Sequence, residues 1–133
     1  MRQYEGFFDA LFFTNCQFGS VQCSDMRLAI PVTEIYLLRG HPLEFAGYGP
    51  FAGQFVFEGA TYSRRTVIEH IGDPRKTGKF RAPYDVIDEI PHTDQIYSEE
   101  LLDFVFEGMQ VFPSAWIDDW TIKARTFKLL VDD

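Results

Sequence analysis

The sequence has few of the features that mark a secreted scaffold or a membrane protein. It contains two cysteines, Cys16 and Cys23, which are too few for a disulfide framework. Its apolar runs fall short of the roughly 20 residues of a membrane span. Asp9 interrupts the N-terminal apolar run before it reaches signal-peptide length. We therefore expect a cytoplasmic protein with no membrane partner.

Motifs for catalysis and metal binding are also missing from the sequence. The histidines at 41, 70 and 92 lack the spacings that form a local metal pair, and there is no Gly-x-Ser-x-Gly nucleophile elbow. In the basic loop 72–83, five residues separate Gly72 from Gly78, and Phe80 stands where a P-loop needs Ser or Thr. The sequence therefore predicts no catalytic residue, no metal site and no cofactor.

Basic residues are scarce. Twelve Lys and Arg face twenty Asp and Glu, which gives a net charge of −8. Such a charge argues against a nucleic-acid partner, because the phosphate backbone repels an acidic surface.

Aromatic residues, in contrast, are abundant, with 14 Phe, 6 Tyr and 2 Trp among 133 residues. Aromatic and β-branched residues favour strands; apolar residues alternate with others between 26 and 32, and β-branched residues dominate 61–71. We predict one domain over 1–133 that is mainly β, an antiparallel β-sandwich or flattened barrel. At most one short helix is expected, over 98–107.

A five-residue repeat marks the expected core strands. Residues 55–59, Phe-Val-Phe-Glu-Gly, return as residues 104–108. For the first copy we expect Phe55 and Phe57 on the buried face and a glycine bulge at Gly59 rather than a hairpin turn. The second copy is open to two interpretations. A strand would bury Leu102, Phe104 and Phe106, whereas a helix would begin after Ser98 and end before Gly108.

Several interruptions are expected between these strands. Pro31 predicts an edge strand or a bulge, because proline cannot donate to a ladder. The stretch 39–53 predicts an irregular loop whose Phe45, Tyr48 and Phe51 pack inward. A turn is expected at 118–119 and a bulge near Thr126.

The strongest functional signal is a segregation of charge. Residues 84–110 contain eight acidic residues and no Lys or Arg. Aromatic anchors supply binding energy and opposite charge steers encounter, so this segment predicts a surface for a basic protein partner. The function indicated is that of a non-enzymatic interaction module, inhibitor-like or immunity-like. Its predicted site residues are Tyr84, Asp85, Asp88, Glu89, Asp94 and Tyr97.

Two alternatives remain open at this point. A pocket under the glycine-rich 40–53 loop would indicate a small-molecule-binding protein or an enzyme. Its predicted lining residues are His41, Tyr48, Tyr62, Arg64 and His70. An exposed sheet edge would instead allow a homodimer with a structural role.

Overall fold

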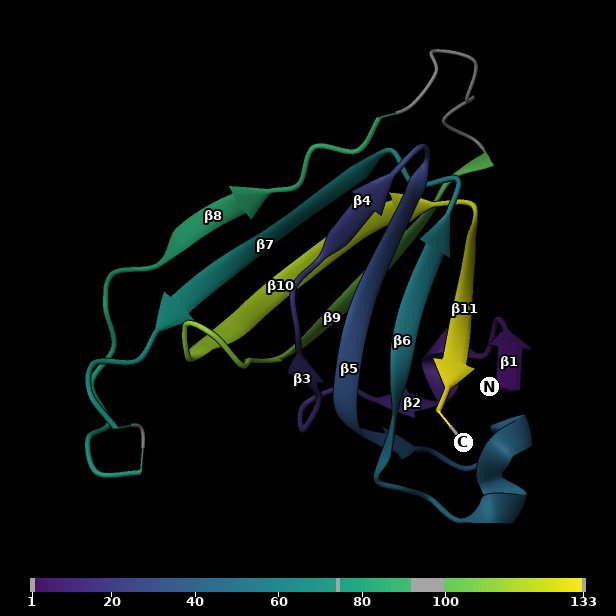
Figure 1. Ribbon diagram of the computed structural model, residues 1–133, viewed down its shortest axis with the longest axis horizontal. Coiled ribbons are helices and arrows are strands. Elements are labelled where there is room, and N and C mark those ends of the chain that lie inside the picture. Colours follow the sequence, from purple (N-terminus) through teal and green to yellow (C-terminus); the bar gives the residue numbers. More distant parts are fainter. Residues whose placement is uncertain (1, 74, 92–99, 133) are drawn as a thin grey trace.

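The computed structural model of the protein describes residues 2–73, 75–91 and 100–132. Within these residues, strands dominate and two short 3₁₀ turns, η1 (Phe8–Ala10) and η2 (Pro42–Ala46), complete the regular structure (Figure 1). The strands are β1 (Arg2–Glu5), β2 (Leu11–Phe12), β3 (Gln17–Phe18), β4 (Gln22–Ser24), β5 (Arg27–Leu37), β6 (Phe51–Glu58), β7 (Tyr62–Glu69), β8 (Tyr84–Ile87), β9 (Leu102–Gln110), β10 (Ala115–Ala124) and β11 (Thr126–Val131).

All of these strands belong to one mixed sheet in the order β1-β11-β6-β5-β3-β9-β10-β7-β8, with β2 and β4 paired to β5. The prediction of a mainly β fold is confirmed. The two-residue strand β3 links the halves of the sheet, antiparallel to β5 and parallel to β9. This parallel ladder is the one departure from antiparallel pairing among the described strands.

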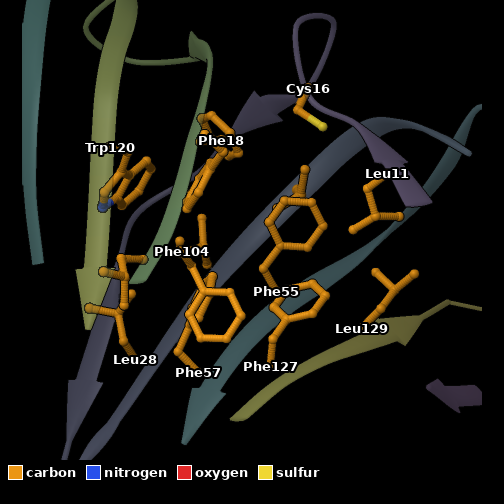
Figure 2. Packing of buried hydrophobic residues seen from close by; sticks show 14 of the residues in the cluster. Leu11, Cys16, Phe18, Leu28, Phe55, Phe57, Phe104, Trp120, Phe127 and Leu129 are labelled. Atoms are coloured by element: carbon orange, nitrogen blue, oxygen red, sulfur yellow. The ribbon is translucent and has the colours of Figure 1, made fainter. Parts of the chain in front are cut away.

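The sheet folds back on itself, so that β6 and β11 face β9 across an aromatic core (Figure 2). Phe57 stacks on Phe106 with ring centroids 6.0 Å apart, although β6 and β9 are not neighbours in the sheet. Period-2 alternation brings Phe55, Phe57 and Phe106 to the interior, where each is at most 4% exposed.

The two glycines of the repeat have different structural roles. Gly59 follows β6 with φ +66° and turns the chain away toward β7, which pairs with β8 and β10 and not with β6. Neither the expected bulge in one long strand nor a β6–β7 hairpin forms. Gly108 lies within β9, where an added Cβ would lie 2.5 Å from the ring of Phe18. Both copies of the repeat therefore form a core strand. Gly59 forms a corner after β6, whereas Gly108 makes a close contact with Phe18 within β9.

The strand interpretation of the second copy is confirmed, because β9 runs over Leu102–Gln110. A helix over 98–107 is wrong from Leu102 onward. Phe104 and Phe106 are buried and Val105 is 52% exposed, as a strand requires. Leu102 is 57% exposed, contrary to the prediction, because the first residue of β9 lies beyond the aromatic core.

The predicted irregularities occur at shifted positions. In the β5–β6 ladder, Pro31 pairs regularly with Gln54, and the register shift comes at 32–35, where Glu34 has φ +56°. Pro31 needs no ladder donor on the other edge of β5, because it lies between the short partners β3 and β4. The turn expected at 118–119 is a bulge in β10, and the irregularity expected near Thr126 is the break between β10 and β11.

The glycine-rich stretch 39–53 is more regular than expected, since it contains η2 and the start of β6. Phe51 packs on the core, as predicted. Phe45 and Tyr48 are 75% and 51% exposed, so the prediction that they pack inward is wrong. The side chains that fill the space under η2 are Leu43 and His41 instead.

Candidate interaction surface

The acidic segment around β8 lies beside arginines of β7. Asp85 accepts hydrogen bonds from the Arg64 guanidinium at 2.8 and 3.2 Å and from the Thr66 hydroxyl at 2.9 Å. These contacts, led by the Arg64 hydrogen bond, lower the pKa of Asp85. The carboxylate is thus ionised and already paired within the chain.

Asp88 is paired more deeply. Its Oδ2 lies 2.6 Å from Arg65 Nη1 and accepts a 2.7 Å hydrogen bond from the Ser63 hydroxyl. Ser63 in turn accepts from Trp120 Nε1, and the Arg65 guanidinium lies 4.7 Å from the Trp120 ring centroid. The Arg65 and Asp88 side chains are each only 12% exposed. This network ties β7, β8 and β10 together and leaves little of the Asp88 charge for a partner.

Other residues of the predicted acidic site are divided between the surface and the undescribed segment. Glu89 is exposed, and Tyr84 is 42% exposed. A hydrogen bond to Glu69 is the main cause of a raised Tyr84 pKa. Asp94 and Tyr97 lie outside the described residues. The eight acidic residues of 84–110 therefore carry less unpaired charge than the sequence count indicates.

The residues of the alternative pocket are not brought together. His41 and Tyr48 lie around η2, whereas Tyr62, Arg64 and His70 lie on or just after β7, near the other end of the sheet order (Figure 1). His70 Nδ1 is 2.9 Å from the Ser114 hydroxyl, and its ring contacts Phe80. No shared cavity under the 40–53 loop joins these five side chains in the described structure.

His41 has a structural role at the start of η2. It is 1% exposed, and its Nδ1 accepts a 3.0 Å hydrogen bond from the Leu43 amide. The ring packs edge-on against Tyr4 at 5.5 Å and lies 5.7 Å from Phe7. Burial lowers the pKa of His41, and the Glu44 carboxylate partly offsets this effect. His41 is therefore a neutral cap that is inaccessible to a ligand.

A groove of about 480 Å³ lies elsewhere, between the N-terminal segment 11–14 and the strands β9 and β10. Its apolar wall includes Phe13, Val105 and Phe106. A second hollow of about 420 Å³ lies beside η1, and Val105 lines both hollows. We call the two neighbouring hollows together the β9 groove. The residues that line it are Phe8, Asp9, Leu11, Phe12, Phe13, Thr14, Leu102, Asp103, Phe104, Val105, Phe106, Glu107, Asp118 and Asp119.

The rim of the β9 groove is acidic. Glu107, Asp118 and Asp119 border its larger part, and no Lys or Arg lines either part. Across 2–73, 75–91 and 100–132, none of these three carboxylates forms an ion pair, whereas Asp85, Asp88 and Asp103 each do. Thr14 donates a 3.3 Å hydrogen bond to Glu107 Oε1. Asp119 accepts a 3.4 Å hydrogen bond from the Thr121 hydroxyl. The Asp85 hydrogen bond is the main cause of a raised Arg64 pKa, and the charge of Asp119 is a smaller one. The groove thus combines an apolar floor with three carboxylates that form no ion pair in the described chain.

The cysteines offer no activated nucleophile. Cys16 is buried, and desolvation raises its pKa to about 12. Cys23 is exposed, but partial burial and the Asp88 carboxylate raise its pKa as well. Within the described residues, no three His, Cys, Asp or Glu side chains are arranged to hold a metal ion. Among the same residues, no helix has the length and apolar character needed to cross a membrane.

Neither a family model, nor a curated protein, nor a solved structure matches this chain.

The β9 groove was not predicted from the sequence, although two of its residues belong to patterns that the sequence shows. Glu107 belongs to the segment 84–110, which contains no Lys or Arg, and the strand interpretation of β9 implies an exposed Val105. Their proximity to segment 11–14 follows only from the folding of the sheet.

Proposed function

We propose that this protein is a non-enzymatic interaction module that binds a basic protein partner through the β9 groove. The observation that carries the proposal is the apolar groove with three rim carboxylates that form no ion pair in the described chain. Apolar side chains supply the desolvated centre of an interface, and a charged rim sets partner choice and encounter rate.

This proposal keeps the function indicated by the sequence and changes its location. At β8, Asp85 and Asp88 are already paired with Arg64 and Arg65, so a basic partner there would have to displace internal ion pairs. Glu107, Asp118 and Asp119 require no such exchange. Binding at the β9 groove is therefore favoured over binding at β8.

The test uses a synthetic peptide library of random sequence and three proteins. The first is the wild type, and the second is the groove variant Glu107→Gln, Asp118→Asn, Asp119→Asn. The third is a matched control, Glu5→Gln, Asp25→Asn, Asp132→Asn, which removes the same charge at exposed sites outside the groove.

The expected result is that wild type and control retain net-basic peptides and the groove variant does not. Binding should also weaken as salt rises from about 0.05 M to about 0.5 M, since salt screens exposed charges. A retained set with no charge preference, or equal losses in the groove variant and the control, would contradict the proposal.

A further inference from the structure

We infer that the β9 groove receives an extended partner segment as an added β-strand on the open edge of β9, with basic side chains outward and apolar side chains inward. This inference rests on the proposed function and specifies how the partner binds.

The first observation is the incomplete pairing of β9. One edge pairs with β10 along the whole strand, from Leu102↔Ala124 to Gln110↔Ala115. The other edge pairs only with the two-residue strand β3, at Met109 and Gln110. From 102 to 108 that edge has no strand partner among the described residues.

The second observation is the direction of the free backbone groups. Met109 N–H donates to the Cys16 carbonyl at 2.8 Å, on the β3 side. Alternate residues of an antiparallel strand point their backbone groups to the same neighbour. The N–H and C=O groups of Val105 and Glu107 therefore point to the open edge, and within the described chain no backbone hydrogen bond outside the β9–β10 ladder satisfies them.

The third observation is the side-chain pattern along this edge. Asp103, Val105 and Glu107 share the outer face of β9, whereas Phe104 and Phe106 face the core. A strand added beside β9 places its own alternate residues on the same two faces. Asp103 is already paired with Lys123, whereas Glu107 forms no ion pair in the described chain. Opposite charges directly across neighbouring strands stabilise a pair, so the outer position beside Glu107 favours Lys or Arg and the inner positions favour apolar residues.

Charge also decides between a foreign segment and a second copy of this chain. Pairing two β9 edges would bring Glu107, Asp118 and Asp119 of one copy toward the same acidic rim of the other. Each whole chain also carries a net charge of −8. Like charges at close range disfavour the pairing, so a basic segment of another protein is the occupant that the rim fits.

The probe is an acetylated and amidated peptide of alternating lysine and valine, about seven residues long to match the open edge. Two further versions carry N-methyl groups on the lysine amides only or on the valine amides only. A strand presents the N–H groups of alternate residues to one side, so only one of these versions removes the bonds to β9. A glutamate–valine peptide is the charge control.

The matched protein variants are Val105→Pro and Val105→Thr. Proline removes an N–H that faces the open edge and is tolerated at edge positions, whereas threonine keeps that N–H in a side chain of similar shape. Affinity is measured by isothermal titration calorimetry at low salt. Near-UV circular dichroism checks that each variant is folded.

The expected result is that the unmodified peptide binds and that one N-methylated version loses about tenfold or more in affinity, equivalent to about 1.4 kcal/mol. Val105→Pro should lose a similar factor and Val105→Thr should not. If Val105→Pro does not fold, the two N-methylated peptides still decide the question, because they need only wild-type protein.

Other outcomes separate the inference from the proposed function. Equal affinity for all three lysine–valine peptides overturns strand addition and leaves basic-partner binding intact. Equal binding of the glutamate–valine peptide overturns the basic-partner function. Failure of every peptide to bind overturns strand addition, while the library test decides the function. A wild-type dimer that Val105→Pro dissociates, seen by analytical ultracentrifugation, assigns the edge to a second copy and overturns the inference.

Discussion

At the scale of single residues, environment rather than residue type decides which charged and polar groups are available. Asp85 and Asp88 are both acidic residues of the same segment, yet each is held by its own arginine. Glu107 has only a hydroxyl partner, Thr14, within hydrogen-bonding distance. His41, which the sequence suggested as a pocket residue, is instead a buried cap with a depressed pKa.

The burial of His41 predicts a pH dependence of stability. Its folded-state pKa lies below the ordinary value of 6.5, so the unfolded state takes up a proton first as pH falls. The stability from neutral His41 is complete above that value and is lost as pH falls below it toward the folded-state pKa. In urea unfolding between about pH 7.5 and about pH 5, the free energy of unfolding should fall more steeply for wild type than for His41→Asn.

Asparagine can also accept the Leu43 amide hydrogen bond as an N-cap, but it does not titrate. Loss of the ring contacts with Tyr4 and Phe7 lowers the stability of this variant at every pH and leaves the difference in slope intact. Parallel pH profiles for the two proteins would rule out His41 as the source of the dependence.

At the scale of elements, β9 contributes both to the core and to the proposed interface. Its inner face supplies Phe104 and Phe106, and Gly108 allows the ring of Phe18 to approach the strand. Its outer edge is left open because β3 pairs with only two of its residues. An edge of this length attracts other strands, and acidic side chains are one means by which proteins restrict such pairing.

The close contact at Gly108 gives a prediction for this element. Gly108→Ala would place a methyl group 2.5 Å from a ring carbon of Phe18, which is 1% exposed and cannot move aside freely. Overpacking of this kind costs about 1–3 kcal/mol in the free energy of unfolding, measured by urea denaturation.

Gly78→Ala is the matched control, because an added Cβ there has no heavy atom within 4 Å. Its stability should change by no more than about 0.5 kcal/mol. Equal stability of the two alanine variants would show that β9 shifts to accommodate the methyl group.

At the scale of the whole molecule, two features join the halves of the folded sheet. The short strand β3 pairs with both halves, and aromatic side chains pack between them in the core. Phe8, from η1, lies within 6.0 Å of the ring centroids of Phe104, Phe106 and Phe127. These partners come from β9 and β11, so one N-terminal side chain joins the two halves of the sheet.

Phe8→Ala should therefore lower the free energy of unfolding by about 2 kcal/mol or more, less than for a completely buried phenylalanine because Phe8 is partly exposed. Phe45→Ala, at a side chain that is 75% exposed, should change it by no more than about 1 kcal/mol. Thermal and urea unfolding of both variants check this difference. Similar losses for both would mean that Phe8 does not join the halves.

The sequence by itself determined the strand-rich fold and the buried faces of its central strands. The reason is local: alternation at Phe55–Phe57 and Phe104–Phe106 places side chains on one face whatever the neighbouring strand is. The bulges and corners observed near 31–35, 58–59 and 118–126 differ from the predicted ones in type or by a few residues in position. The reason is that the register with partner strands sets their positions.

Only the tertiary structure decided which strands are neighbours. The placement of β7 beside β8 pairs Arg64 and Arg65 with the acids predicted to bind a partner. The short β3 leaves the edge of β9 open, and segment 11–14 forms the opposite wall of the groove. These contacts join residues up to about a hundred positions apart, and a local pattern carries no information about which distant edge a strand meets.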